Sequence, residues 1–477
     1  MATVGAGAAR EHPAEVGGIH HDLLTARVGA PAPAGRAGEL ESVGLAVAAG
    51  PLGHNVCDDD AVVVGAGLAG LTAALRLAEE GRSVLVLAKG IGATHLAPST
   101  IDVLGYSADG EPVESPASGL ASLIDESADH PYARVGMETV ASALDWWKNA
   151  VPGLRYSGGL DANVLLPTAT GAAKPTALCP ATIAGGDLRL GGRIAVVGLR
   201  GLKDFYARYV ANNLERSARA RGASVRVRAV ELEPPVDGEG DVGGIAFAAR
   251  FERPEFRDAV VEKLRTLLAP GERAGLPAVL GLRDADGVHR ELEERLRTNV
   301  FEIAMLPPSI PGMRLFEELK GALRRAGGRL VLGDRVIGAE TNGRRVEAIV
   351  AQTAARRVSH PARSFVLATG GFASGGLELD SDWTVRETVL GLPVAGVPPP
   401  GAPRFLPGYF DRHPLARAGL EVDERLHPLE SGRPVYENLH AAGATLAGAE
   451  PWREASGNGI SVATGFAAAQ AIIESTR

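Results

Sequence analysis

The sequence is poor in cysteine and in long apolar runs, and each shortage excludes a class of protein. Its 477 residues include two cysteines, Cys57 and Cys179, and no C-x-x-C pair. The chain by itself therefore cannot bind a cysteine-ligated iron–sulfur cluster or a zinc ribbon, and we expect no metal site. The longest apolar run, from Ala61, reaches Arg76 before it could span a membrane. Without a charged and then apolar leader, we expect a cytoplasmic protein.

Aromatic residues and positive charge are also scarce. Aromatics make up 5% of the chain, against 61 glycines, and the formal net charge is −8. An acidic balance of this kind gives no support to nucleic acid or an anionic membrane surface as a partner. The apolar share of 45% and the charged share of 22% are ordinary for a soluble globular enzyme. The length predicts two or three domains with ample core.

A glycine motif follows a β-branched run near residue 62. Val62-Val63-Val64 enters Gly65-Ala66-Gly67-Leu68-Ala69-Gly70, and an Ala/Leu-rich helical pattern leaves it. In this strand–turn–helix frame Gly65 permits the turn, Gly67 lets a phosphate approach the backbone, and Gly70 lets helix and strand pack closely. The helix N-terminus offers N–H groups to the phosphate. The motif predicts a nucleotide or flavin site.

The second strand, 83–87, ends without the acid that dinucleotide-binding proteins use for the adenosine ribose. The position reads Ala88-Lys89. This departure disfavours NAD and fits FMN better than FAD, which we keep as the alternative. Lys89 is a candidate for contact with a phosphate. A loop of small and hydroxylated residues follows, 90–102, and in flavoproteins of this topology it passes beside the flavin ring. Within it, His95 and Ser99 are candidates for hydrogen bonds to the flavin.

Residues 151–315 lose the β-branched parallel pattern and are predicted to form an inserted α+β cap or substrate domain. Amphipathic helices are expected near 205–220, 254–268 and 291–296. Before the insertion closes, a proline- and glycine-rich loop places Arg314 in a stiff setting that suits a small anion. Lys174, Lys203 and Arg314 are the cations we select for phosphate or flavin contact.

The chain then returns to the first domain through a helix from 315 to 326 and strands at 329–332, 335–340 and 346–351. A buried strand, 365–368, ends in Thr-Gly-Gly, and a later strand turns at a glycine. A second glycine-rich loop feeds the last helix, whose N-terminus can stabilise negative charge on a reduced flavin. The cofactor-binding candidates from these segments are Thr369, Gly370, Gly443, Gly457, Asn458 and Gly459.

The predicted fold class is α/β, with a Rossmann-like flavin-binding domain built as a three-layer parallel sheet and interrupted by the inserted domain. Residues 1–58 are expected to be a disordered tail or a start called too early. The flavin-binding domain takes up 59–150 and 316–477, on either side of the insertion at 151–315.

The order of these segments resembles the B-subunit family of anaerobic glycerol-3-phosphate dehydrogenases, within the succinate dehydrogenase/fumarate reductase-like flavoproteins. The N-terminal motif, the Thr94-His95 loop, Leu306-Pro307-Pro308-Ser309, Leu367 to Phe372 and Gly457-Asn458-Gly459 carry the resemblance. It implies FMN and oxidation of glycerol 3-phosphate to dihydroxyacetone phosphate. It also implies two partner subunits. One is an FAD-containing A subunit. The other is a membrane-associated iron–sulfur C subunit, which passes electrons towards quinone. The chain would then lie at the inner face of the cell membrane through a partner.

Two other interpretations stay open from the residues. One is a self-contained fumarate reductase-like flavoprotein acting on a small carboxylate, although its arginine- and histidine-rich active site is not clearly present. His413 is a candidate member of such a site. The other is a non-catalytic subunit that binds its partner and no cofactor.

Overall fold

The structure is a computed structural model, and it describes residues 59–475 apart from 236–241 and 410. The tail predicted at 1–58 lies outside the described residues. Within the described residues, no helix has both the length and the apolar character needed to cross a membrane.

The sheet that carries the glycine motif has seven strands, and its central part is parallel. The strand at its centre, β1, is fully buried from Ala61 to Val63 because a parallel sheet is covered on both faces. The second half of β14 pairs in parallel with β1 and β19. Its first half pairs antiparallel with β13. In spatial order the strands are β11 (Arg329–Leu332), β2 (Val84–Ala88), β1 (Asp59–Val64), β14 (Arg357–Leu367), β13 (Arg345–Gln352) and β12 (Arg335–Asn342), with β19 (Leu439–Ala441) on β14.

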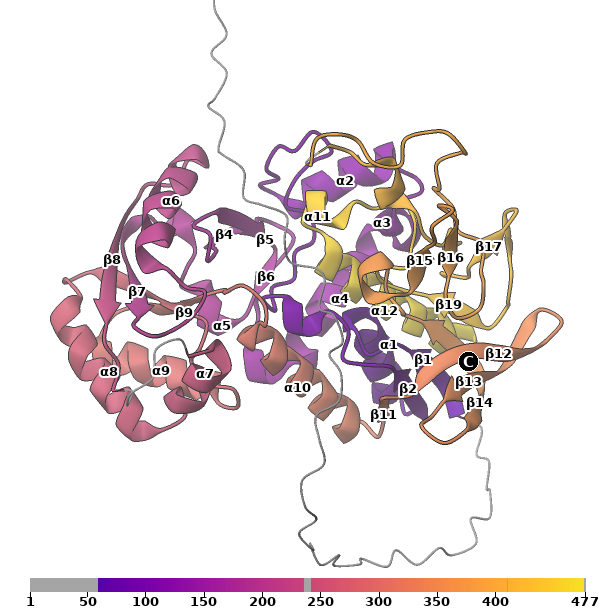
Figure 1. The fold of residues 1–477 in the computed structure, drawn as a ribbon, viewed down its shortest axis with the longest axis horizontal. Helices are drawn as coiled ribbons and strands as arrows, with labels where there is room; N and C mark the ends of the chain where they lie inside the picture. Colours follow the sequence, from indigo (N-terminus) through magenta and orange to yellow (C-terminus); the bar gives the residue numbers. More distant parts are fainter. Residues whose placement is uncertain (1–58, 236–241, 410, 476–477) are drawn as a thin grey trace, which may run out of the picture. The chain divides into compact units, whose positions relative to one another are not determined.

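Two helices from opposite ends of the chain pack closely on this sheet. They are α1 (Leu68–Glu79), which follows the motif, and α12 (Gly457–Ser475), the last helix. A Cβ on Gly465 would overlap the carbonyl oxygen of Ala69, so a glycine is required where the helices touch. Figure 1 shows α12 beside α1 and α4 (Met137–Ala150). The predicted strand–helix–strand start is therefore completed by the C-terminal helix.

A second sheet lies within residues 192–303, and all four of its strands are parallel. This corrects the expected loss of the parallel pattern in the inserted region. The run Ile194–Val197 is completely buried, and its β-branched signal was not recognised in the sequence. In Figure 1, α6 lies on one side of the sheet and α7, α8 and α9 on the other. The elements are β7 (Gly192–Leu199), α6 (Ala207–Ala220), β8 (Val225–Leu232), α7 (Gly244–Phe251), α8 (Pro254–Leu267), β9 (Glu272–Pro277), α9 (Ala285–Leu296) and β10 (Val300–Ile303).

Short elements complete the described chain. They are η1 (Thr94–Leu96), α2 (Pro116–Glu126), α3 (Pro131–Val135), η2 (Pro152–Leu154), β3 (Ser157–Gly158), β4 (Val164–Pro167), β5 (Ala173–Thr176), β6 (Leu178–Cys179), α5 (Ala181–Ala184), η3 (Leu188–Leu190), η4 (Phe372–Ser374), β15 (Leu377–Leu379), β16 (Val385–Glu387), η5 (Pro414–Arg417), β17 (Leu429–Glu430), β18 (Arg433–Pro434) and α11 (Pro451–Glu454).

Buried apolar side chains fall into two large clusters. One surrounds the seven-stranded sheet, and the other, from Leu165 to Ile310, surrounds the second sheet. The division predicted at 151 and 315 stays a prediction.

A buried ion pair fastens α10 (Ile310–Arg325) to β10. The Arg314 guanidinium donates to both carboxylate oxygens of Glu302, at 2.6 and 2.9 Å, and to the carbonyl oxygen of Gly281 at 2.7 Å. Although burial alone would raise it, the charge and hydrogen bonds of Arg314 lower the pKa of Glu302. Both side chains are almost fully buried, so removing one partner leaves an uncompensated charge.

We expect Arg314→Met to lower the free energy of unfolding by about 3–5 kcal/mol, because Glu302 would remain charged and unpaired in the core. The measurement is the urea midpoint of the full chain. Arg324→Ala, at an exposed position near the end of the same helix, is the matched control and should leave the midpoint unchanged. An unchanged midpoint with loss of a bound flavin would instead assign Arg314 to a ligand site.

Candidate functional site

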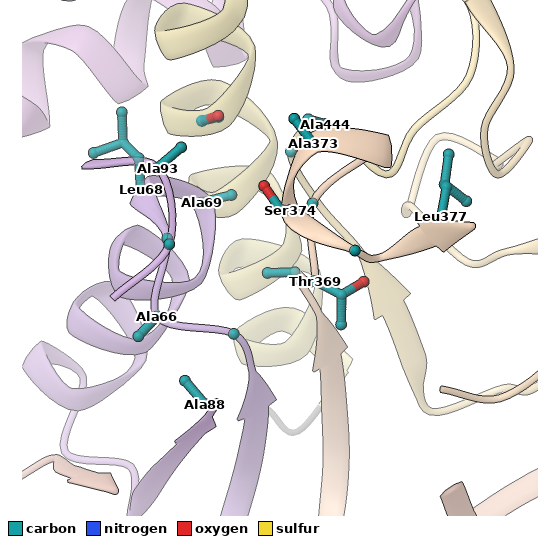
Figure 2. Close-up of a pocket in the computed structure, with 18 of the residues that line it drawn as sticks. Ala66, Leu68, Ala69, Ala88, Ala93, Thr369, Ala373, Ser374, Leu377 and Ala444 are labelled. Carbon is teal, nitrogen blue, oxygen red and sulfur yellow. The ribbon is translucent and has the colours of Figure 1, made fainter. Parts of the chain in front are cut away.

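A cavity of about 1270 Å³ opens at the carboxyl ends of the parallel strands of the seven-stranded sheet. The last residues of β1, β2 and the segments after β14 and β19 all line it. Open α/β sheets bind ligands at this edge, where the strand order reverses. Figure 2 shows Ala66, Leu68 and Ala69 of the glycine turn and helix start on one side of the cavity, and Thr369 and Ser374 on the other.

The glycine turn forms part of the cavity wall. Gly65 has φ +114°, and a Cβ there would overlap the carbonyl oxygen of Ala368. A Cβ on Gly70 would overlap the carbonyl oxygen of Gly65, so helix and turn are in backbone contact. Gly67 differs, because a Cβ on it would meet no atom within 4 Å. That open space faces the cavity, as expected of backbone left bare for a ligand.

No side chain of its own sequence caps the backbone N–H groups at the N-terminus of α1. Gly67 occupies the cap position without a side-chain acceptor, and the first turn contains no acidic residue. Leu68 and Ala69, the first two helical residues, line the cavity. A helix start with bare N–H groups and positive dipole charge is suited to a phosphate.

Two buried hydroxyl groups in the cavity wall have no hydrogen-bond partner among the described residues. They are the Oγ1 atoms of Thr94, in η1, and Thr369, two residues after the end of β14. A buried hydroxyl without a partner costs free energy unless a water or a ligand satisfies it. Both groups are therefore candidates for contact with a bound molecule.

The first turn of α12 forms another part of the cavity wall. Asn458 and Ser461 line it, and the Asn458 amide donates to the carbonyl oxygen of Thr100 at 2.7 Å. This bond ties the loop after β2 to the start of the last helix. The arrangement gives the cavity a second helix N-terminus, as the sequence predicts.

The structure brings together most, but not all, of the residues predicted to bind a cofactor. Gly70 and Gly459 are packing positions, since a Cβ on Gly459 would overlap Tyr132. Gly457 begins α12 just outside the lining. The predicted residues that line the cavity are Gly65, Gly67, Lys89, Thr369, Gly370, Gly443 and Asn458.

His95 and Ser99 lie outside the cavity lining, although their neighbours Thr94, Leu96 and Ala97 belong to it. The His95 ring packs edge-on against Phe316 at 5.2 Å, and burial lowers its pKa. Ser99 is buried beside a separate space of about 10 Å³. The predicted loop therefore reaches the cavity through Thr94, Leu96 and Ala97 and not through His95 or Ser99.

Lys174 does not line the cavity. From β5 its Nζ reaches the Asp102 carboxylate and the Thr100 hydroxyl, the latter at 3.3 Å. Thr176 also donates to Asp102, at 3.0 Å. Because the carbonyl of the same Thr100 binds Asn458, this cluster adjoins the start of α12.

The other predicted catalytic candidates are placed differently. The Arg314 guanidinium is committed to Glu302, which departs from the expected anion site. Lys203 is exposed and does not line the cavity. His413 lies in an aromatic cluster between Phe405 and Trp452, with ring centroids 5.7 and 6.2 Å away. Of these rings, Phe405 lines the cavity.

Several lining residues were not selected from the sequence. Thr94 belongs to the predicted loop, but the orientation of the 3-10 turn η1 decides whether its side chain lines the cavity, and the sequence does not show that orientation. Arg335 and Val336 at the start of β12, and Glu378 in β15, come from short strands with no recognisable motif. In the described ranges no group of three or more His, Cys, Asp or Glu side chains could hold a metal ion.

Comparisons with known proteins agree with this geometry. The family described as FAD binding domain matches residues 60–460. The chain is 36% identical over 435 residues to a Halobacterium salinarum protein named as the probable B subunit of an anaerobic glycerol-3-phosphate dehydrogenase, covering 87% of this chain and 98% of the relative. It is 32% identical to the Pectobacterium atrosepticum protein named as the B subunit of the same dehydrogenase, with the same coverage. A solved 3-ketosteroid delta1-dehydrogenase from Sterolibacterium denitrificans is 14% identical at a TM-score of 0.41, covering 87% of this chain and 99% of that chain.

We expect Gly67→Ala to leave the flavin-free fold intact and to weaken flavin binding about tenfold, equivalent to about 1.4 kcal/mol. The reason is that the new methyl group enters open space in the cavity instead of meeting protein atoms. Flavin fluorescence quenching measures the affinity, and the melting temperature of the flavin-free chain measures the fold. Gly159→Ala, at another open glycine outside the cavity lining, is the control. Equal flavin affinity in both variants would contradict the assignment.

Proposed function

The chain belongs to the FAD-binding flavoproteins, in the B-subunit family of anaerobic glycerol-3-phosphate dehydrogenases, and is a flavin oxidoreductase subunit; from this premise we propose that it takes part in oxidising glycerol 3-phosphate to dihydroxyacetone phosphate. The two electrons released would pass towards quinone through an iron–sulfur partner. The observation that carries the proposal is the cavity at the strand ends, with bare glycine backbone in its wall.

The residues present fit a flavin. The open Gly67 backbone and the start of α1 would receive phosphate, and the Thr94 and Thr369 hydroxyls would gain the partners they lack among the described residues. The first turn of α12 would meet the end of the cofactor that becomes negative on reduction. A bound flavin supplies the two-electron acceptor for the oxidation of a secondary alcohol.

The extent of the cavity supports FAD over the FMN expected from Ala88. Its lining includes Asn458 of α12, the glycine turn, Arg335 of β12 and Glu378 of β15. A phosphate group at the turn would leave room for ligand on both sides, whereas FMN needs only one. The volume of about 1270 Å³ exceeds the range of about 300–1,000 Å³ usual for small-molecule sites. FMN stays a prediction to be tested against FAD.

Lys174 is the cation that we propose for the substrate phosphate. Its Nζ is already held beside Thr100, whose carbonyl oxygen binds the cavity residue Asn458. The Lys174 side chain is 27% exposed, so it can exchange one anionic partner for another. Thr176 would keep the Asp102 carboxylate in place during such an exchange.

The proposed partners are the FAD-containing A subunit of the same dehydrogenase and its membrane-associated iron–sulfur C subunit. The relatives are named as one subunit of a dehydrogenase, and the two cysteines of this sequence cannot ligate a cluster by themselves. Exposed Trp383, Phe405 and Trp452 near the cavity have the composition of protein interfaces, with Arg404 over the Trp383 ring. A contact there would place the acceptor near Phe405 and the cavity wall.

We expect the chain purified with its partner subunits to reduce a dye with glycerol 3-phosphate, and the chain alone to hold a flavin but to lack quinone reduction. Acid extraction followed by chromatography identifies the flavin. Fumarate reduction by the chain alone, with a reduced viologen as donor, would favour the self-contained reductase. A colourless chain with no flavin in either preparation would favour the non-catalytic subunit.

For Lys174→Ala we expect the KM for glycerol 3-phosphate to rise roughly tenfold with the flavin content unchanged, since one charge-assisted bond to phosphate would be lost. Steady-state kinetics of the complex provides the measurement, and Lys174→Arg should restore part of the loss. Lys203→Ala is the matched control at an exposed lysine away from the lining. An unchanged KM, or a loss of flavin together with activity, would show that Lys174 has another role.

A further inference from the structure

A buried polar cluster surrounds the short turn between α11 and α12. Its acid is Glu454, the last residue of α11, whose side chain is 9% exposed. The carboxylate accepts from the Ser456 hydroxyl at 2.7 Å and from the backbone N–H of Glu450 at 2.8 Å. On its other side lies the fully buried His130, with Nε2 3.3 Å from Glu454 Oε2. Three donors therefore converge on one carboxylate in the protein interior.

These hydrogen bonds keep the Glu454 carboxylate ionised. The backbone N–H of Tyr132 donates to His130 Nδ1 at 3.1 Å, so the ring proton lies on Nε2 and points to Glu454. Burial by itself raises the pKa of Glu454, but its interactions with His130, the Glu450 N–H and Ser456 lower that pKa below its ordinary value. A fixed negative charge therefore stands inside the protein at neutral pH.

Glu454 differs from the other buried acids near the start of α12 in its partners. Asp102 pairs with Lys174, and Glu450 pairs with Arg412 at 3.0 Å. No lysine or arginine that the structure describes forms an ion pair with Glu454. A neutral glutamine could accept hydrogen bonds at this position with a lower desolvation cost. The charge of this side chain, and not only its hydrogen bonding, therefore requires an explanation.

The charge lies beside the helix start that lines the cavity. Ser456, which donates to the carboxylate, immediately precedes α12, and Asn458 belongs to the lining. The Tyr132 hydroxyl donates to the carbonyl oxygen of Ser456 at 3.3 Å and leaves no room for a Cβ on Gly459. The first turn of α12 is thus packed against the cluster. A helix N-terminus stabilises negative charge in front of it, and a carboxylate at the same end offsets part of that effect.

We propose that Glu454 lowers the reduction potential of the bound flavin by placing a fixed negative charge at the start of α12. This inference rests on the proposed function, which puts the end of the flavin that becomes negative on reduction in front of this helix. The dipole of α12 favours the added negative charge, and the Glu454 carboxylate opposes it. The reduced flavin is therefore a stronger donor to the next electron acceptor than the helix alone would make it.

The test is the midpoint potential of flavin bound to the full chain, measured by absorbance during equilibration with a reference dye in the absence of oxygen. FMN and FAD are each supplied to the flavin-free chain, and each flavin that binds is measured. We expect Glu454→Gln to raise the ratio of reduced to oxidised flavin at a given potential about tenfold, which is about 30 mV for a two-electron couple. Glu454→Asp keeps the charge and should stay near the wild-type potential.

Ser456→Ala is a second variant that leaves the acid in place. It removes one donor from the carboxylate, so the negative charge is less compensated and the potential should fall. Loosening of α12 would move the potentials of Ser456→Ala and Glu454→Gln in the same direction, whereas the charge predicts opposite shifts. The matched control is Glu272→Gln, at a buried acid of the second sheet that pairs with Arg228, and it should leave the potential unchanged.

The outcomes separate this inference from the proposed function. An unchanged or lower potential in Glu454→Gln overturns the role of Glu454 and leaves the flavin assignment standing. A rise of the same size in Ser456→Ala or Glu272→Gln also overturns it, since the effect would then come from a loosened structure. If Glu454→Gln does not fold or binds no flavin, the presence or absence of the fall expected in Ser456→Ala decides. A wild-type chain that binds neither flavin overturns the proposed function itself and this inference with it.

Discussion

Backbone meets backbone at Gly65, and the cavity depends on this contact. A side chain at Gly65 would overlap Ala368 at the end of β14, and one at Gly70 would overlap Gly65. The turn after β1 is therefore packed between the start of α1 and a strand from the last third of the chain. Because main-chain atoms make these contacts, the turn has little freedom to move sideways. The remaining glycine of the motif, Gly67, is free to face the cavity.

The same constraint continues along α1. Gly443, after β19, has φ +81°, and its Cβ position lies 2.8 Å from the Cβ of Ala69. Gly465 of α12 approaches the carbonyl oxygen of Ala69. One small residue of α1 thus touches two segments from the end of the chain. This explains why a site begun near residue 65 is completed only after residue 440, and why small residues are frequent on these surfaces.

The sequence allowed prediction of those parts of the site that are built from residues adjacent in the chain. The strand, glycine turn and helix at 59–79 form one local unit, and Thr369-Gly370 follows a buried strand directly. Glu378 and Arg335 could not be found in this way, because an antiparallel pair and a hairpin bring them to the cavity. The second parallel sheet was missed because β8 alternates exposed and buried residues, unlike a strand buried on both faces. The partner of Arg314 depends on how α10 packs on β10, which no local pattern encodes.

The two buried or half-buried ion pairs show why a cation's surroundings decide what it can bind. Arg314 and Glu302 are 5% and 0% exposed, and a substrate anion could displace Glu302 only by leaving a carboxylate unpaired in the core. Lys174 and Asp102 are 27% and 11% exposed, and Asp102 has a second partner in Thr176. Solvent screens such a pair, so separating it costs far less. An anion can therefore compete for Lys174 far more easily than for Arg314, although the sequence presents both as isolated positive charges.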